Sequence, residues 1–539
     1  MMLGLRFRHV FDTTVSMLIA SAAFCAAACE SVVWPMAQPG NTPSLVVNSA
    51  NAEVMTPDGR DDGAAHDNSL ASDAMGTGDL VFTVLAALAP LTLMVAVAPL
   101  HFLKGGTAVP GAFIMAGGIM AMFAIGFMSI SRYVQNSGAF YSVIAKGLGK
   151  PIGSGAAMVA LLAYNSLQIS TYGAFGLYAQ EALDKYLHAA IPWWGYALVA
   201  LLSVAWLGYR GIHTSARVLA CILVAEISVL VVLAFAVGLA GGPEGFPKES
   251  FMPSNLLQTN KGAMYALIFG AFMGFESTTI FSEEARGGYR TVRRATFIAV
   301  GFIATFYSIM TAVVVTAYGS STIQRQAEKD PINLVVNVFV HFTPPAVVEA
   351  MHLLLLGSAF AALLALHNVC NRYFYALGRE HLLPKALGTT HPKYKSPWLA
   401  GTLQSALAIG FIGLTCLLGV DPYLGLLLWG SAMGMLGIIF LWALCSAAIV
   451  VFLYTHEVAG GHWTTAIAPL VAFVALASTF SLALANLSFL TGAPQWVDAM
   501  LIGAGAIAFV SGIGAALRMR RRHPSWYCKL ADGGRGGPN

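Results

Sequence analysis

Charged side chains are scarce in this chain of 539 residues. Asp, Glu, Lys and Arg together make up 10% of the sequence, whereas 57% of it is hydrophobic. The mean hydropathy is +0.71. Soluble globular domains are about one quarter charged, so the composition excludes that class and indicates a polytopic membrane protein whose main surroundings are a lipid bilayer. The net charge of +4 is small and gives no reason to expect nucleic-acid binding.

Several functional motifs are also missing. The seven cysteines are scattered and odd in number, which predicts neither a disulfide framework nor a metal site. The sequence has no G-x-x-x-x-G-K-[ST] phosphate loop and no H-E-x-x-H pair, which excludes an ATP-driven pump and a membrane metalloprotease of those types. We therefore expect no enzyme activity, no cofactor and no metal. A channel is disfavoured because no selectivity-filter sequence or repeated pore-lining polar segment is present.

Residues 1–78 differ from the rest of the chain. Arg6 and Arg8 precede an apolar run at residues 15–29, which resembles a signal-peptide core but is short for a membrane span. The sequence from Gln38 to Gly78 is polar and is predicted to be disordered. Two interpretations stay open, namely a signal peptide and an upstream start codon with initiation at Met75.

The remainder of the chain contains apolar runs long enough to cross a bilayer, separated by charged or Pro/Gly-rich breaks. We expect a transmembrane domain at residues 79–522 and a short tail at 523–539. The twelve predicted spans are 79–103, 110–133, 152–186, 192–209, 213–240, 261–283, 294–319, 345–375, 398–420, 423–454, 463–490 and 495–518.

Lysine and arginine are unevenly distributed between the two sides that these spans define. Most of the 29 basic residues fall in the segments on the side of the first span's amino terminus. Because basic loops stay in the cytoplasm, we expect a multi-pass protein of the cell membrane with both termini cytoplasmic.

The stretch from Lys261 to Arg294 has the pattern of a broken transmembrane helix. An apolar helix is interrupted around Phe272, Gly274 and Phe275, and Glu276 follows at membrane depth. A helix opened in the membrane exposes backbone groups that hydrocarbon cannot satisfy. Half-helix ends also carry partial charges, so the break is able to receive a carboxylate and an ammonium group together. An amino acid fits this description.

These residues resemble the amino acid-polyamine-organocation permease superfamily. Its sixth helix typically reads F-x-G-F-E, followed by E-E-x-x-x-x-x-R-x-x-x-R-A. The matching residues are Phe272, Gly274, Phe275, Glu276, Glu283, Glu284, Arg290, Arg294 and Ala295. The segment RYFYALGREHLLP at residues 372–384 is similar to the family's cytoplasmic loop after helix eight. The resemblance extends from about residue 79 to 522.

The resemblance implies an all-α fold with a LeuT-like arrangement. It has two five-helix repeats of inverted topology, broken helices one and six, and two extra helices. The family often has a glycine-rich break in helix one, whereas this chain has Ala86 to Leu91 with Pro90 inside the run. Proline removes a backbone donor and clashes with the preceding turn. We therefore expect Ala87, Ala89, Pro90 and Leu91 to form the first break and to line the substrate site.

Two membrane-embedded carboxyl groups are candidates for ion coupling. Glu226 stands among apolar neighbours in span 213–240, near the place where proton-coupled relatives carry a lysine. A carboxyl group shielded from water favours its neutral form, which allows it to carry a proton. A buried Glu bonded to backbone is the alternative for this residue. Glu276 either responds to protons or caps the exposed N–H groups of its own break.

Other polar and aromatic residues are weaker candidates. Tyr164, Gln168, Thr171 and Tyr172 share a stripe of span 152–186, and either line the pocket or bond between helices. Phe272 and Phe275 flank the break and are predicted to contact substrate or to act in gating, the alternative being core or lipid-facing phenylalanines. His367, with Asn368, is predicted to join the coupling site by facing span one, the alternative being a packing histidine.

Together these features predict a secondary transporter that moves an amino acid or a related amine by alternating access, coupled to protons by symport or exchange. A permease for polyamines or ethanolamine is the alternative within this class. A channel, or a membrane sensor with a permease-like body, is the alternative outside it.

Overall fold

The computed structural model describes residues 70–131, 140–187, 191–258, 261–456 and 463–531. These ranges contain helices and no strand; a single isolated backbone bridge joins Met75 to Ala285. The prediction of an all-α polytopic fold is confirmed.

The helices that correspond to the predicted spans follow one another in sequence order. They are α2 (Thr77–Ala87), α3 (Pro90–Thr92), η1 (Leu93–Val97), α4 (Ala98–Gly105), α5 (Val109–Ser131), α7 (Lys150–Leu187), α8 (Trp193–Tyr209), α9 (Ile212–Ala240), α11 (Gly262–Gly270), η5 (Phe275–Thr279), α12 (Tyr289–Tyr318), α15 (Pro345–Arg379), α16 (Trp398–Leu417), η7 (Pro422–Leu428), α17 (Trp429–Thr455), η8 (Trp463–Ile467), α18 (Ala468–Ala485) and α20 (Gln495–Arg522).

Shorter helices connect them. These are η2 (Gly106–Ala108), α6 (Phe140–Leu148), η3 (Lys248–Phe251), α10 (Pro253–Leu256), α13 (Ile323–Lys329), α14 (Leu334–Phe342), η6 (Lys385–Gly388), α19 (Leu487–Thr491) and α21 (Pro524–Lys529).

Within the described residues, nine helical stretches are long and apolar enough to cross a membrane. The first of them, Thr77–Ser131, covers two of the predicted spans. The shorter α8 and the pair α11 and η5 correspond to predicted spans 192–209 and 261–283. Each of the twelve predicted spans therefore has a helical counterpart, while the inverted repeat stays a prediction.

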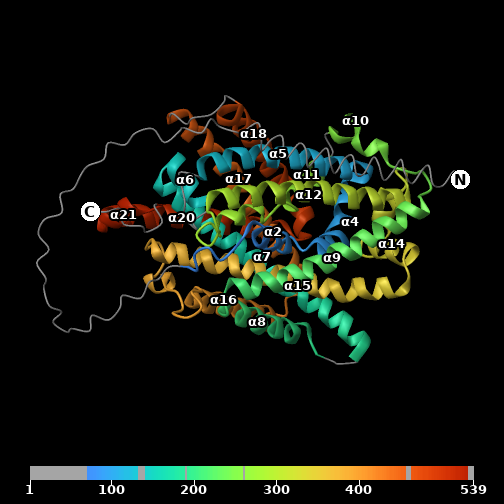
Figure 1. Ribbon diagram of the computed structural model, residues 1–539, viewed down its shortest axis with the longest axis horizontal. Helices are drawn as coiled ribbons and strands as arrows, with labels where there is room; N and C mark the ends of the chain where they lie inside the picture. Colours follow the sequence, from blue (N-terminus) through green and yellow to red (C-terminus); the bar gives the residue numbers. More distant parts are fainter. Residues whose placement is uncertain (1–69, 132–139, 188–190, 259–260, 457–462, 532–539) are drawn as a thin grey trace, which may run out of the picture.

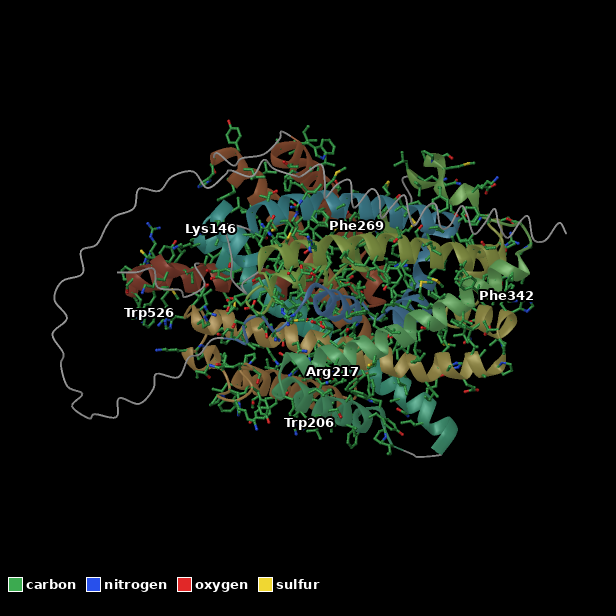
Figure 2. All side chains as sticks on the ribbon, viewed as in Figure 1. Lys146, Trp206, Arg217, Phe269, Phe342 and Trp526 are labelled. Atoms are coloured by element: carbon green, nitrogen blue, oxygen red, sulfur yellow. The ribbon has the colours of Figure 1, made fainter. Side chains whose placement is uncertain are left out.

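The long helices lie roughly side by side along the longest axis of the molecule (Figure 1). The broken first span, α2 to α4, runs through the middle of this view, with α5 and α18 above it and α8 and α16 below it. In Figure 2, Phe269 lies among the packed helices and Trp206 lies at the outer edge of α8, where 55% of its surface is exposed. We call the two ends of the molecule the α21 end and the α14 end.

Small residues allow the helices to approach closely. A Cβ atom added to Gly117 in α5 would lie 2.3 Å from the Cβ of Ala304 in α12, so only glycine fits at this crossing. Close backbone approach of this kind is how helices associate in membranes, where apolar burial alone offers little gain.

The segment before α2 packs onto the fold at the α21 end. Leu70 and Met75 are buried, and the backbone of Met75 bonds to Glu284 O at 2.9 Å and to Arg286 N at 2.8 Å. The prediction of disorder is therefore wrong for residues 70–78, because these apolar side chains find partners that the local sequence does not reveal. Residues 1–69, including the signal-like run, lie outside the described residues.

Candidate functional site

The first helix break lies between α2 and α3. Ala89 has φ +45° and ψ 70°, a left-handed conformation that is costly for a residue with a side chain. Pro90 follows, and a proline disfavours the helical conformation of the residue before it. Local sequence thus determines where this helix opens, at the place that the sequence predicts.

Residues from other helices cap the second half of this broken helix. The N–H of Leu91 donates to Oε2 of Glu226 at 3.1 Å, and the N–H of Thr92 donates to Oγ of Ser358 at 3.2 Å. The Ser358 hydroxyl in turn donates to Oε2 of Glu226 at 2.8 Å. Glu226 in α9 and Ser358 in α15 together cap the amino-terminal end of this half-helix.

One of the two carboxyl oxygens of Glu226 takes no part in these hydrogen bonds. The side chain is fully buried, and its Oε1 has no hydrogen-bond partner among the described residues. Through its bond to the N–H of Leu91, Glu226 holds the α3 terminus in place. Its second oxygen is still available to a proton or a cation.

The second break lies between α11 and η5. After Gly270 the chain makes tight turns, and Gly274 has φ +112°, which favours glycine. The hydroxyls of Ser277, Thr278 and Thr279 donate to the carbonyls three residues earlier, at 2.5, 3.0 and 2.8 Å. These bonds favour a tight 3₁₀ turn, which explains why η5 replaces the regular half-helix expected up to residue 283.

Glu276 stabilises this second break. Its Oε2 accepts from the N–H of Gly274 at 3.0 Å, and its Oε1 accepts from the hydroxyl of Tyr164 in α7 at 2.5 Å. Both side chains are fully buried. The carboxyl group thus caps backbone within its own break, as one of the two interpretations expected, and Tyr164 is its partner.

The two breaks face each other. A Cβ atom on Gly274 would lie 3.7 Å from the Cβ of Ala87 and 3.7 Å from Cδ2 of Leu88. Ala87 is partly exposed, although its neighbours from Thr83 to Pro90 are buried. Ala87 therefore keeps some accessible surface next to the second break.

Aromatic rings surround the second break. The Phe275 ring lies 5.9 Å from Phe123 in α5 and 5.8 Å from Trp442 in α17, between ring centroids. Phe272 is also buried. Aromatic side chains therefore cover the break on the side of α5 and α17.

The predicted polar stripe of α7 separates into two groups. Tyr164 reaches Glu276, whereas Gln168 contacts the Tyr172 hydroxyl and the His367 ring, both at 3.4 Å, and accepts from Gln404 in α16. Thr171 bonds to the carbonyl of Leu167 in its own helix. Gln168 thus belongs to an interhelical polar cluster and does not join Tyr164.

His367 does not face span one as predicted. Its ring packs against the backbones of Gly208 in α8 and Gly401 in α16, where added Cβ atoms would lie 2.8 and 3.6 Å from ring atoms. In the described part of the chain it makes no hydrogen bond to Glu226. The packing alternative fits this position, because the two glycines leave room for an imidazole.

A buried ion pair lies near the α21 end. Arg372 in α15 donates to both carboxylate oxygens of Glu284, at 2.5 and 2.8 Å, and both side chains are at most 3% exposed. Arg379 pairs with Glu283 at 2.8 Å and is more exposed. Both pairs connect α15 to the segment after η5 and hold these two parts of the chain together at this end of the molecule.

Sequence reasoning missed Ser358, Phe123 and Trp442. Ser358 is a small polar residue in an apolar span, a weak signal that many packing serines share. The two aromatic residues carried no signal, because a buried ring is the ordinary content of an apolar helix.

The sequence matches the amino acid permease family over residues 76–511. The match covers most of the chain, and the chain belongs to this family. The superfamily resemblance of residues 272–295 is thereby confirmed.

Several relatives match shorter stretches of this chain, and the names of two of them give different substrates. The branched-chain amino acid permease BcaP of Bacillus subtilis is 26% identical over 39% of this chain and 44% of its own length. The low-affinity putrescine importer PlaP of Escherichia coli is 22% identical over 61% of this chain and 72% of its own length. An uncharacterized transporter of Mycobacterium tuberculosis is 26% identical over 39% of this chain. The chain spans about half the length, 48%, of that relative.

Proposed function

We propose that this protein is a secondary transporter of neutral amino acids with apolar side chains, driven by protons, in the cell membrane with both termini cytoplasmic. The observation that carries the proposal is the contact between two helix breaks, each capped by a buried carboxyl group. The family of the chain and the name of the relative BcaP support it.

The substrate class follows from the groups around the breaks. Each carboxyl oxygen of Glu276 already accepts one hydrogen bond, from Tyr164 or from Gly274, which leaves this group less available to a cationic substrate side chain. Phe123, Phe275 and Trp442 offer an apolar surface. An apolar side chain matches this surface, because transfer of apolar area out of water is favourable by about 25 cal/mol per Å².

Proton coupling follows from the position of Glu226. In its ionised form it neutralises the positive end of α3 and repels a substrate carboxylate approaching the same break. When Glu226 takes up a proton, the repulsion disappears and the N–H groups of α3 are better able to attract that carboxylate. Proton and substrate therefore bind more tightly together than apart, and by linkage each favours the other.

An amine substrate is the second candidate. The unpartnered Oε1 of Glu226 is a buried acceptor that an ammonium group would satisfy, and one relative is named a putrescine importer. In this case Glu226 would bind the substrate in its ionised form, and protons would compete with it.

Uptake by proteoliposomes distinguishes the two candidates. We expect accumulation of labelled leucine, isoleucine or valine under an imposed proton gradient, and little uptake of putrescine or ethanolamine. Preferential uptake of an amine, inhibited by acid on the substrate side, would replace the first candidate by the second. Accumulation driven by sodium alone would reject proton coupling.

A further inference from the structure

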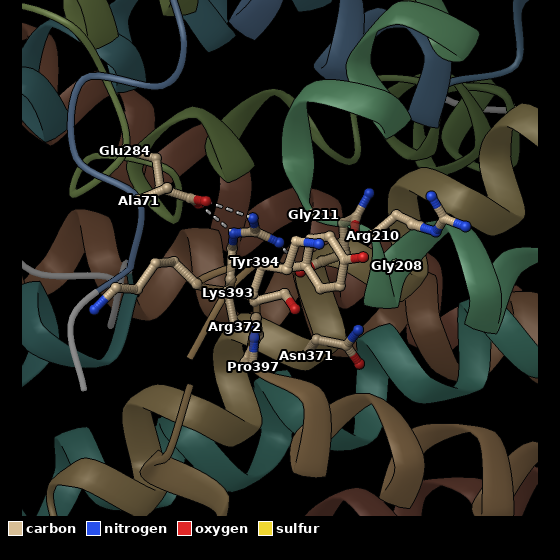
Figure 3. A pocket seen from close by; sticks show the side chains of 13 residues that line it. Ala71, Gly208, Arg210, Gly211, Glu284, Asn371, Arg372, Lys393, Tyr394 and Pro397 are labelled. Atoms are coloured by element: carbon tan, nitrogen blue, oxygen red, sulfur yellow. Dashed lines mark hydrogen bonds and ion pairs between the residues drawn. The ribbon is translucent and has the colours of Figure 1, made fainter. Parts of the chain in front are cut away.

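A cavity of about 280 Å³ lies at the α21 end, away from the two breaks. Its walls come from the junction of α8 and α9, from α15, from the segment before α16 and from the segment before α2. Figure 3 shows the Arg372 guanidinium in the middle of this view, joined to Glu284, with Tyr394 and Asn371 nearby.

The cavity is lined by an excess of positive charge. Arg210, Arg372, Lys393 and Lys395 contribute cations, whereas Glu284 is the one acidic residue among the described residues that line the cavity. Glu284 is bound through both oxygens by Arg372, so it neutralises that one cation. Arg210 and Lys393 are exposed at the cavity, so both can turn toward a ligand. An anion is the ligand that this charge distribution favours.

Two buried amide groups in the wall lack partners. Asn368 and Asn371 are 3% and 4% exposed, and neither Nδ2 of Asn368 nor Oδ1 of Asn371 has a hydrogen-bond partner among the described residues. Buried polar groups are nearly always satisfied, so this donor and this acceptor in the lining residues are available to a ligand that both accepts and donates. A phosphate group with an attached or neighbouring O–H or N–H has this chemistry.

We propose that the cavity binds a phosphate-type oxyanion, and that the bound oxyanion holds this end of the protein closed. The wall includes Ala71 from the segment before α2, Glu284 from the segment after η5 and Arg372 from α15. The first two flank the broken spans and the third lies in a neighbouring helix, so opening this end would separate them. A ligand held by the cations of this wall binds better to the form in which the three segments lie together, and it shifts the population toward that form.

The oxyanion has two sources, a lipid headgroup and a free phosphate compound. Trp206 and Tyr209 are exposed beside the cavity, Arg210 lies 4.7 Å from the Trp206 ring, and the Tyr209 ring lies 5.6 Å from that of Tyr394. Exposed aromatic residues of this kind gather at the level of the lipid headgroups, and basic pockets between helices bind such headgroups. Both sources offer the same phosphate oxygens.

The test compares the purified full chain with the double variant Arg210→Gln/Lys393→Gln. Both replaced side chains are exposed, so the fold should persist, which a matching size-exclusion profile and circular dichroism spectrum would verify. The control is Lys385→Gln, which removes an exposed lysine outside the lining of this cavity. The unfolding temperature is measured in detergent against inorganic phosphate, with chloride at equal ionic strength, and in nanodiscs with or without phosphatidylglycerol.

We expect phosphate or phosphatidylglycerol to raise the unfolding temperature of the wild type and of Lys385→Gln, and to do so much less in the double variant. An effect of phosphate alone identifies a soluble ligand, and an effect of phosphatidylglycerol alone identifies a lipid. Equal shifts in the wild type and the double variant, or no shift in either, would show that the cavity does not bind the oxyanion. This readout does not depend on transport, so failure of the proposed function leaves it intact.

The effect on gating is measured separately. Proteoliposomes that contain the active ligand on the α21 side should take up substrate more slowly than liposomes without it, and the double variant should lose this inhibition. Unchanged or faster uptake in the wild type would overturn the closing role.

Discussion

The carboxyl group of Glu226 in α9 accepts a hydrogen bond from the backbone N–H of Leu91 at 3.1 Å, across 135 positions of sequence. The same oxygen accepts from the hydroxyl of Ser358 in α15. A single titratable group thus connects the broken first helix to two others. Any change in its protonation alters how the three are held, and this is the physical basis of the coupling that we propose.

Replacement of Glu226 by Gln tests that coupling, because Gln mimics the neutral acid. We expect Glu226→Gln to keep substrate binding and exchange, but to lose accumulation driven by a proton gradient and to show little dependence on pH. The measurement is counterflow and gradient-driven uptake in proteoliposomes over a range of pH. Glu249→Gln, which neutralises an exposed carboxylate in η3, serves as the control. If Glu226→Gln still concentrates substrate with the wild-type pH profile, Glu226 is a structural residue.

Replacement of Tyr164 by Phe tests the cap of the second break. The change removes the donor that reaches Glu276 and leaves a buried carboxyl oxygen without it. We expect a loss of about 1 to 3 kcal/mol in the free energy of unfolding, and weaker substrate binding. Tyr172→Phe, in the same helix, removes only a long contact of 3.4 Å and should cost less. Equal losses in the two variants, measured by denaturation in detergent, would contradict a special role for Tyr164.

Enlargement of Ala87 tests whether substrate occupies the space between the breaks. The helical conformation of Ala87 accepts any side chain, whereas the φ of +112° at Gly274 would make Gly274→Leu strained whatever the space. We expect Ala87→Leu to abolish binding of a labelled substrate with a near-normal unfolding temperature, and Ala87→Ser to bind almost normally. Wild-type affinity in Ala87→Leu would place the substrate elsewhere.

The ion pair between Arg372 and Glu284 should matter for stability mainly because removing one partner leaves the other charge buried and unpaired. Arg372→Met leaves Glu284 buried and unpaired, which should cost about 3 to 5 kcal/mol of stability. Arg379→Met removes a more exposed partner and should cost about 0 to 1 kcal/mol. The double variant Arg372→Met/Glu284→Met should recover much of the stability. Chemical denaturation in detergent measures all three, and a double variant as unstable as Arg372→Met would contradict this account.

A variant that begins at Met75 should insert into the membrane and transport substrate, because the spans begin after that residue. This variant keeps Met75. It lacks Leu70, which is buried in the full chain, and Ala71, which lines the cavity. We therefore expect slightly lower stability than in a variant that begins one residue before Leu70, and weaker binding of phosphate or phosphatidylglycerol. Membrane fractionation, uptake and unfolding temperature test these points. Loss of insertion would show that the preceding residues are required.

The family, the spans and the position of both breaks were predictable from the sequence, because each depends on local properties. Length and hydropathy determine where a helix can cross a bilayer. Pro90 and Gly274 determine where the backbone departs from the helix. The motif from Phe272 to Ala295 indicated the superfamily for the same reason, since it lies within one continuous stretch.

Only the tertiary structure decided which side chains meet. Sequence spacing placed Tyr164 and Gln168 on one stripe, but small rotations along α7 direct one to Glu276 and the other to Gln404 and His367. The position of His367 depended on two glycines, Gly208 and Gly401, in other helices. Ser358 became a partner of Glu226 through the packing of α15 against α9. In a bundle whose helices are apolar on nearly every face, hydropathy does not distinguish inner from outer surfaces, so the close fit of small residues determines these contacts.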